Sequence, residues 1–593
     1  MNEGKLPNFS RLRGQGSFSP LTTSIPPESP VAWSTFLTGL DAGGHGIFDF
    51  IHRDPATLVP YLSTTTTQAA EWTLPLGRWR IPLWQGDITL NRKGRAFWEI
   101  LEDHGIPCTI VRIPANYPPT NSDARQLAGM GTPDLEGTYG TFSFYTDEPA
   151  GSYGDVAGGR VFYVRVRRDR VEANLPGPNN SFERGSPQLS IPFTVVIDAS
   201  NPVAKVIIQD RQVVLQPREW SEWIPVRFEM LPLGTASANG IVRFYLKEIR
   251  PDFKLYVSPV NVDPSNPVLP ISQPAGYARE LQQKLGNFST LGIPEDTKAL
   301  SGGILDRAEF LAQSRLLREE ENRLLDDQLE NFKSGVLFFY SGRADQLQHM
   351  FWREMETRDP EFGSTIEQVY QDMDSLVGYA VSHVDPRTLV IALSDHGFAS
   401  FSRAFSLNNW LEQQGYAARR RDAGSGYLES FDWARTRAYG LGFTGLYLNL
   451  KGREKNGRLP AAERSALLDE IRKKLLEIRD PANGKPVVTK VYRADRVYSG
   501  AEAARGPDLV VGYNRGYRAS WESVLGLFSA QVIADNTDQW SGDHLMDPEL
   551  VPGILFTNRP IKAAKPGLLD LAPTILKEFG VGKGASMKGN SIF

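Results

Sequence analysis

Cysteine is almost missing from this sequence, which has only Cys108 among its 593 residues. A single thiol excludes an internal disulfide framework and an all-cysteine zinc site, so any metal ligands have to be Asp, Glu or His side chains. Long hydrophobic runs are also missing, because stretches such as Val336 to Tyr340 are far shorter than the roughly 18 residues of a membrane span. We therefore expect no membrane span in this chain and interpret these runs as buried strands.

An excess of positive charge is missing as well. The chain has 65 Lys and Arg residues against 69 Asp and Glu residues, which gives a net charge of -4. It therefore lacks the broad basic surface by which proteins bind nucleic acids, and any recognition of phosphate has to be local. With 41% hydrophobic and 23% charged residues, the composition is that of a globular protein.

The periodicity of the sequence predicts an α/β protein with a large insertion. The first part alternates helical stretches with short apolar runs, whereas the next part has the period-two runs of a β-rich domain of sandwich type. A charge-dense helical segment follows, in which Arg307 to Asn331 reads as one long amphipathic helix, and then the α/β pattern returns. The predicted segments are a first part of an α/β core, a β-rich insertion, a helical segment and a second part of the core, at residues 1–148, 159–264, 275–333 and 334–593.

Two of the predicted strands end at side chains that can bind metals. The strand Val336 to Tyr340 leads into Asp345 and His349, which share a face if the segment is helical. Alone this spacing is weak, since a helix start with an incidental His gives the same pattern. The next strong strand ends at Asp395 and His396, followed by a glycine that suits a tight turn.

Two further segments complete the candidate site. Trp540-Ser541-Gly542-Asp543-His544 places a histidine among turn residues, where an ordinary surface position is an equally good interpretation. Upstream, Ser29 as an N-cap, Pro30 at the first helical position and Gly39 as the stop predict a short helix. The positive end of that helix, at Ser29, suits a phosphate group.

These segments together resemble the alkaline-phosphatase superfamily, specifically its type I phosphodiesterase/nucleotide pyrophosphatase branch and a predicted phosphohydrolase/phosphomutase group within it. The resemblance covers roughly residues 4–148 and 335–593, leaves the β-rich insertion outside, and implies a central, mostly parallel sheet flanked by helices. Its motifs occur in the expected order: Ser29 with Thr38-Gly39 and His45-Gly46-Ile47, Asp345 with His349, Asp395-His396-Gly397, and Gly542-Asp543-His544. From the residues alone, we interpret His45 as structural, because it follows the residue at which the helix is predicted to end.

The resemblance implies metal-dependent hydrolysis of a small phosphorylated substrate through a phosphoseryl intermediate. It assigns one divalent metal ion to Asp345, His349 and His544. It assigns the second to Asp395 and His396, with Ser29 as the metal-bound nucleophile. Mixed Asp and His ligation suits zinc, with manganese as the alternative.

Two differences from the motifs of related enzymes reduce the number of possible substrate classes. Nucleotide pyrophosphatases carry Thr as the nucleophile and Asn three residues later, whereas this chain has Ser29 and Ala32. The sulfatase pattern is also missing, since Pro30 directly follows Ser29 and the first Arg after Ser29 is Arg53. Nucleotide diesters and sulfate esters are therefore disfavoured.

Two alternatives to hydrolysis stay open at this point. A phosphomutase would use the same phosphoseryl intermediate and return the phosphoryl group to a second hydroxyl. A non-catalytic binding protein on a degenerate hydrolase scaffold would bind its partner through the β-rich insertion. Two tightly bound metal ions favour an enzyme.

The resemblance also implies a ligand that is not found before Ser29. The second metal site of the superfamily takes another Asp from the end of the first strand, but Met1 to Arg11 read as the tail of a helix and a loop, with no strand and no Asp. We therefore predict that the sequence is N-terminally truncated and that the full protein begins with an apolar strand ending in Asp-Gly. The cellular location stays open: cytoplasmic if Met1 is the true start, and exported if an upstream signal precedes it.

Overall fold

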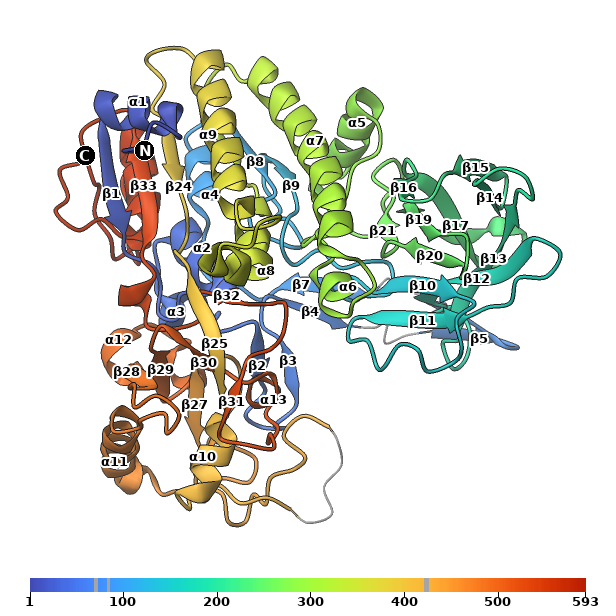
Figure 1. Cartoon of the computed structure of the whole chain (residues 1–593). Helices are drawn as coiled ribbons and strands as arrows, with labels where there is room; N and C mark the ends of the chain where they lie inside the picture. The colour runs from blue at the N-terminus through green and yellow to red at the C-terminus, as the bar shows by residue number, and fades with distance from the viewer. Residues whose placement is uncertain (69–72, 83–85, 421–425) are drawn as a thin grey trace.

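The computed structural model describes residues 1–68, 73–82, 86–420 and 426–593, and it has the predicted α/β architecture. Figure 1 shows a sheet-and-helix part that carries both termini, a second α/β part below it and a β-rich part at the side. None of the helices in the described ranges combines the length and the apolar character needed to cross a membrane.

The part that carries the termini contains two sheets. One has the strand order β1-β33-β24 and is antiparallel, whereas the other has the order β22-β9-β8-β23, in which β8 is parallel to both β9 and β23. Its strands are β1 (Ser17–Leu21), β8 (Cys108–Val111), β9 (Arg125–Leu127), β22 (Ser272–Gln273), β23 (Val336–Phe339), β24 (Ile391–Leu393) and β33 (Gly553–Thr557). Its helices are α1 (Pro7–Gln15), α2 (Ser29–Thr38), α3 (Ala42–His45), α4 (Phe97–Glu102), α8 (Arg343–Thr357), α9 (Thr365–His383) and α14 (Leu571–Glu578).

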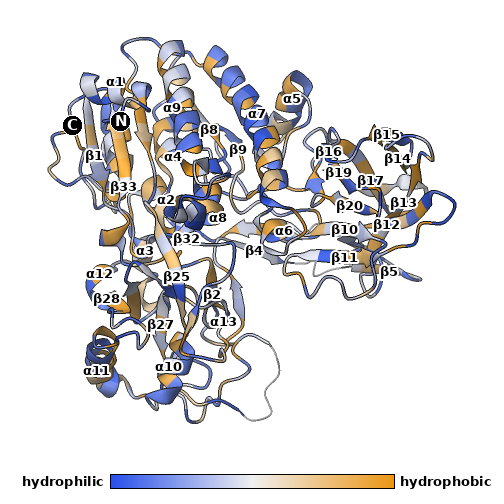
Figure 2. Cartoon of the chain, viewed as in Figure 1, coloured by the Kyte–Doolittle hydropathy of each residue, from blue (hydrophilic) through white to orange (hydrophobic). Residues whose placement is uncertain are grey.

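Strands β23 and β24 are each the end strand of their sheet, yet both pack against one buried cluster. The cluster contains Trp33, Phe36 and Leu37 of α2 together with residues of α4 and α14. Because apolar strands need a covered face, this shared cluster makes the two sheets halves of one layer. Figure 2 shows the hydrophobic character of β33 and β24 in this layer. The upstream strand predicted from the sequence stays a prediction.

Helix α2 begins one residue earlier than expected. Ser29 is its first helical residue and Glu28 is the N-cap residue, so the prediction that Ser29 caps the helix is wrong by one position. Gly39 ends the helix in the left-handed conformation, with a φ of 64°, as predicted for a helix stop. Every residue of α2 is buried, so Ser29 is the first residue of a helix that belongs to the core.

The β-rich part begins before the predicted insertion. β10 precedes residue 159 but pairs with β11 and β20, so the sheet extends into the preceding segment. Its strands are β10 (Phe142–Thr146), β11 (Gly159–Tyr163), β12 (Arg170–Asn179), β13 (Gln188–Ile197), β14 (Ala204–Ile208), β15 (Arg211–Leu215), β16 (Glu219–Trp220), β17 (Ile224–Leu231), β18 (Ala236–Val242), β19 (Phe244–Glu248), β20 (Lys254–Val257) and β21 (Asn261–Val262). Helices α5 (Tyr277–Leu285), α6 (Thr297–Ser301) and α7 (Arg307–Asn331) then lead back to the core.

The remaining elements form the lower part and short connecting strands. The lower part contains β25 (Ala399–Phe405), α10 (Leu407–Gln413), β26 (Ala438–Gly440), β27 (Gly445–Leu448), α11 (Arg464–Leu476), β28 (Val488–Arg493), α12 (Ala494–Val497), β29 (Leu509–Tyr513), β30 (Gly516–Ala519), α13 (Trp521–Val524), β31 (Ile533–Asp535) and β32 (Gly542–Asp543). The connecting strands are β2 (Ile51–Arg53), β3 (Pro60–Leu62), β4 (Thr65–Gln68), β5 (Thr73–Leu76), β6 (Trp79–Pro82) and β7 (Asp87–Leu90).

A buried ion pair joins β2 to the lower part. Arg53 and Glu454 both have fully buried side chains, and Nη2 of Arg53 lies 2.7 Å from Oε1 of Glu454. We expect Glu454→Ala to lower the free energy of unfolding by about 3–5 kcal/mol, because it leaves the guanidinium buried without its counter-charge. Chemical denaturation measures the loss. Glu463→Ala, which removes a half-exposed partner 4.0 Å from Arg437, is the control and is expected to cost less than about 1 kcal/mol. Equal losses in the two variants would contradict the prediction.

Candidate active site

The structure gathers all six predicted site residues at one end of the core strands. Asp345 and His349 lie on α8, which follows β23, and Asp395 and His396 follow the end of β24 after one intervening residue. Ser29 begins α2, and His544 directly follows β32. In α/β sheets the carboxyl ends of strands are the usual place for ligands, so the topology alone makes this a candidate site.

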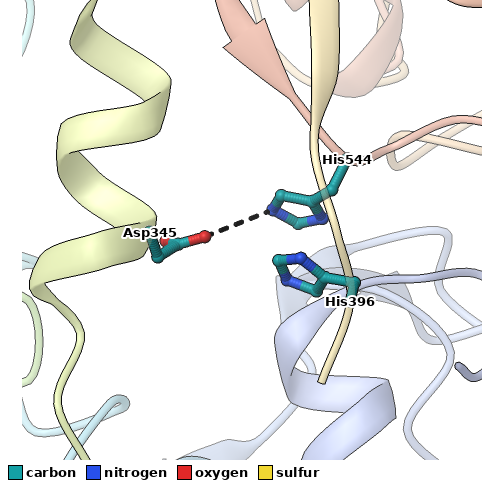
Figure 3. A group of neighbouring side chains, drawn as sticks. All are labelled: Asp345, His396 and His544. Atoms are coloured by element: carbon teal, nitrogen blue, oxygen red, sulfur yellow. Dashed lines mark ion pairs between the residues drawn. The ribbon is translucent and has the colours of Figure 1, made fainter. Parts of the chain in front are cut away.

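Asp345 joins two of the histidines. Because it lies one helical turn from His349, its Oδ2 is 3.6 Å from Nε2 of His349. Its Oδ1 is 4.0 Å from Nε2 of His544, the contact drawn in Figure 3. Asp345, His349 and His544 are therefore neighbours, and their assignment to one metal ion stays a prediction.

Ser29 lies beside the other predicted pair. Its Oγ is 3.1 Å from Nε2 of His396, and that nitrogen is 3.3 Å from Oδ2 of Asp395. The Ser29 side chain is buried, as are both neighbours, so its hydroxyl is held within the site.

One group of possible metal ligands combines residues that were predicted to bind two different ions. In the part of the chain that the structure describes, Asp345, His396 and His544 have ligand atoms within 4.8 Å of one another. The rings of His396 and His544 stack with centroids 3.5 Å apart and an interplanar angle of 12° (Figure 3). The two sets thus adjoin each other, and the division of the ligands between two ions stays a prediction.

The hydrogen bonds of the histidines to backbone carbonyls use Nδ1 and leave Nε2 to face the site, where that of His396 lies 3.1 Å from the Ser29 hydroxyl. Nδ1 of His349 donates to the carbonyl of Gly542 at 2.8 Å, and Nδ1 of His544 donates to the carbonyl of Pro27 at 2.7 Å. Nδ1 of His396 lies 3.2 Å from the neighbouring carbonyl of Gly397. These bonds fix the tautomer that presents an unprotonated Nε2, the arrangement usual in metal-ligating histidines.

The carboxylates of the site also indicate a place for a cation. Oδ1 of Asp345 and Oδ2 of Asp395 are buried and have no hydrogen-bond partner among the described residues. Buried carboxylate oxygens without a partner are costly, and a cation removes that cost. The residues present therefore fit divalent metal ions.

Burial sets the protonation states of the site. It lowers the pKa of His349, His396 and His544 to about 3, so these imidazoles are neutral near pH 7. Burial, together with the charge of Asp395, raises the pKa of Asp345 well above its usual value, and burial raises that of Asp395 to about 6. Neutral imidazoles beside carboxylates that lack a counter-charge are the state that a metal ion stabilises.

Glu28 directly precedes Ser29 and belongs to none of the motifs that predicted the site. Its side chain is fully buried, and its Oε1 accepts a hydrogen bond from the Phe50 amide at 2.9 Å. Burial raises the pKa of Glu28 well above its usual value and that of Asp49 to about 7. The Phe50 amide thus holds the buried Glu28 carboxyl group at the start of α2. No local pattern links residues so far apart in the sequence.

His45 has the structural role expected for it. Its ring is fully buried, with Nε2 3.1 Å from the Thr35 hydroxyl and Nδ1 accepting from the Ile47 amide at 3.2 Å. These bonds join α3 to α2. His45 therefore supports the helix that carries Ser29.

Comparison with protein families gives a match over most of the chain. Residues 1–174 and 241–524 match the family described as type I phosphodiesterase / nucleotide pyrophosphatase. The unmatched residues 175–240 lie in the β-rich part, and the match ends before His544. A search of curated proteins finds no match.

Solved structures offer weak likenesses only. Phosphonoacetate hydrolase from Sinorhizobium meliloti 1021 with phosphonoformate is 11% identical, with 96% of this chain and 89% of that chain covered and a TM-score of 0.41. Human ectonucleotide pyrophosphatase / phosphodiesterase 5 is 10% identical, with 99% and 92% covered and a TM-score of 0.40. Wild-type alkaline phosphatase PafA is 11% identical, with 99% and 95% covered and a TM-score of 0.41. Nothing is inferred from these structures, because their TM-scores and identities are low. The family of this chain is shown by the family match.

Proposed function

Since this chain belongs to the type I phosphodiesterase / nucleotide pyrophosphatase family and is therefore a phosphoric ester hydrolase, we propose that it uses Ser29 as its nucleophile and forms a phosphoseryl intermediate. The substrate is a small phosphate monoester or diester. The site takes two divalent metal ions, zinc or manganese, held by Asp345, His349 and His544 and by Asp395, His396 and Ser29.

One observation supports this proposal above the others. The Ser29 hydroxyl lies 3.1 Å from Nε2 of His396, inside a group of neutral imidazoles and of carboxylates that each have one buried oxygen without a hydrogen-bond partner among the described residues. A serine that only caps a helix needs none of these neighbours. Such an arrangement of nucleophile and metal-capable side chains is typical of metal-assisted phosphoryl transfer.

The reaction transfers the phosphoryl group in two displacements. In the first, the Ser29 oxygen forms a bond to phosphorus while the bond to the leaving alcohol oxygen breaks, and the hydroxyl proton passes to the site or to the leaving group. In the second, water attacks phosphorus and the bond to the Ser29 oxygen breaks, which restores the hydroxyl and releases phosphate from a monoester substrate or a phosphate monoester from a diester substrate. When bound, the two metal ions lower the pKa of the nucleophile and stabilise the charge on the leaving oxygen.

The fold contributes orientation and charge to both steps. Ser29 is the first residue of α2, so the positive end of that helix dipole faces the transferred group. The carbonyls of Gly542 and Pro27 hold the rings of His349 and His544 in one orientation. These groups are in place before substrate binds, which reduces the reorganisation needed in the transition state.

We expect the purified protein to release nitrophenolate from p-nitrophenyl phosphate or bis(p-nitrophenyl) phosphate, and a chelator to abolish this release until zinc or manganese is restored. The same chelator saturated with zinc beforehand is the control and is expected to leave the rate unchanged. Activity that survives exhaustive removal of metal would reject the two-metal proposal. Transfer of the phosphoryl group to a second alcohol without release of phosphate would identify the chain as a phosphomutase.

A further inference from the structure

A buried arginine, Arg518, lies near the histidines of the site, on a strand that carries none of the predicted site residues. Arg518 lies on β30, which is parallel to β25, and β25 also pairs with β32, where Asp543 directly precedes His544. The side chains of Arg518 and Asp543 are both fully buried, and Nη1 of Arg518 donates to Oδ2 of Asp543 at 2.8 Å.

Aromatic rings hold the guanidinium of Arg518 in place. Its central carbon lies 4.0 Å from the ring centroid of Trp521, 4.2 Å from that of Phe401 and 5.2 Å from that of Phe443. Cation–π contacts and a buried counter-ion are what make a buried guanidinium tolerable. The packing therefore fixes the atom that donates to Asp543.

Asp543 also holds the loop that carries His544 in place through hydrogen bonds. Its Oδ1 accepts hydrogen bonds from the backbone amides of His544 at 2.8 Å and Leu545 at 3.0 Å. Its Oδ2 accepts from Arg518 and, at 2.9 Å, from Nε1 of Trp540. With four donors, the carboxylate has one available orientation, and the backbone at His544 is fixed with it.

Trp540 extends the constraint to a second histidine. Its indole stacks on the ring of His349, with centroids 3.8 Å apart and an interplanar angle of 28°. The Gly542 carbonyl, in the same loop, accepts the Nδ1 proton of His349. His349 on α8 and His544 on the loop are thus both oriented by the segment that Asp543 holds.

We propose that Arg518 is a positioning residue that, through Asp543 and Trp540, sets the orientation of His349 and His544 for metal binding. This inference rests on the proposed metal site, and it assigns a role to side chains that touch neither metal nor substrate. Outer partners of this kind change metal affinity by about 10- to 100-fold when they are removed.

Zinc affinity, measured by competition with a chromogenic chelator, tests the proposal. Trp540→Phe keeps a ring over His349 but removes the donor to Asp543, and we expect zinc to bind about tenfold more weakly. Arg518→Met is expected to weaken zinc binding more strongly, with partial rescue in Arg518→Lys, which keeps the charge. If the Arg518 variants do not fold, the zinc affinity of Trp540→Phe alone decides the outcome.

Arg53→Met is the matched control, because Arg53 is also fully buried, ion-paired and stacked on a tyrosine ring, but in the pair with Glu454. It is expected to lose stability without losing zinc affinity. Zinc affinities within twofold of the parent in Trp540→Phe and the folded Arg518 variants would overturn the positioning role, as would an equal loss in Arg53→Met. A parent protein that binds no zinc or manganese would instead overturn the proposed metal site itself.

Discussion

Ser29→Ala is expected to lower the rate of aryl phosphate hydrolysis by about a thousandfold or more, because removing a catalytic nucleophile has effects of this order or larger. The variant removes only the Oγ atom, which lies 3.1 Å from Nε2 of His396. Steady-state kinetics measures the loss of kcat. Circular dichroism and metal analysis are expected to give the values of the parent, since α2 keeps its packing and the other proposed ligands stay in place.

Ser34→Ala is the matched control for this prediction. Ser34 is a buried serine of the same helix, but its hydroxyl donates to the Pro30 carbonyl at 2.6 Å and is therefore engaged in the helix. This variant is expected to keep the rate of the parent within a few-fold. A rate for Ser29→Ala within a few-fold of the parent would point to a metal-bound water as the nucleophile, whereas loss of activity in Ser34→Ala alone would place the nucleophile at Ser34.

His544→Ala is expected to weaken zinc binding by more than about 100-fold, beyond the range seen when an outer partner of a metal ligand is lost. His544 belongs to the group with Asp345 and His396, so its removal leaves the Asp345 carboxylate beside an open position. His349→Ala is expected to have a similar effect, because its Nε2 lies 3.6 Å from the same carboxylate. Metal analysis after dialysis and kcat for an aryl phosphate measure both losses.

His383→Ala provides the comparison for the histidine variants. His383 lies at the exposed end of α9, where Nδ1 bonds to the Tyr379 carbonyl at 2.8 Å. It is expected to keep full metal content and rate. Full metal occupancy in His544→Ala and His349→Ala would reject their assignment as ligands and move the site toward Asp395 and His396.

Elements with strong periodicity were predictable from the sequence. The helix Arg307–Asn331 has the bounds predicted, and the strand predicted at Val336 to Tyr340 is β23, Val336–Phe339. By contrast, β1 was not predicted, because Ser17–Leu21 contains Pro20 and no β-branched residue. An edge strand tolerates such a sequence, and β1 is the edge strand next to β33.

The site was predictable to the extent that it follows strands and short motifs. Asp395 and His396 come just after β24, and Asp345 and His349 share a helix face, so local pattern made them candidates, whereas their roles as ligands came from the resemblance. The contacts of Arg518 with Asp543 and of Glu28 with the Phe50 amide join segments that are distant in the sequence. Such contacts depend on how strands are ordered in the sheets, which periodicity does not determine.

The division of the core strands between two sheets has a consequence for amide hydrogen exchange. In β23 and β24, alternate amides point toward β8 and β33, so those of Leu337, Phe339, Ile391 and Leu393 point the other way, where no strand pairs with them in the described residues. These four amides are expected to exchange with solvent deuterium faster than those of Phe338 and Ala392, which point toward β8 and β33. Their protection therefore reports directly on whether the inner edges of the layer are covered in solution.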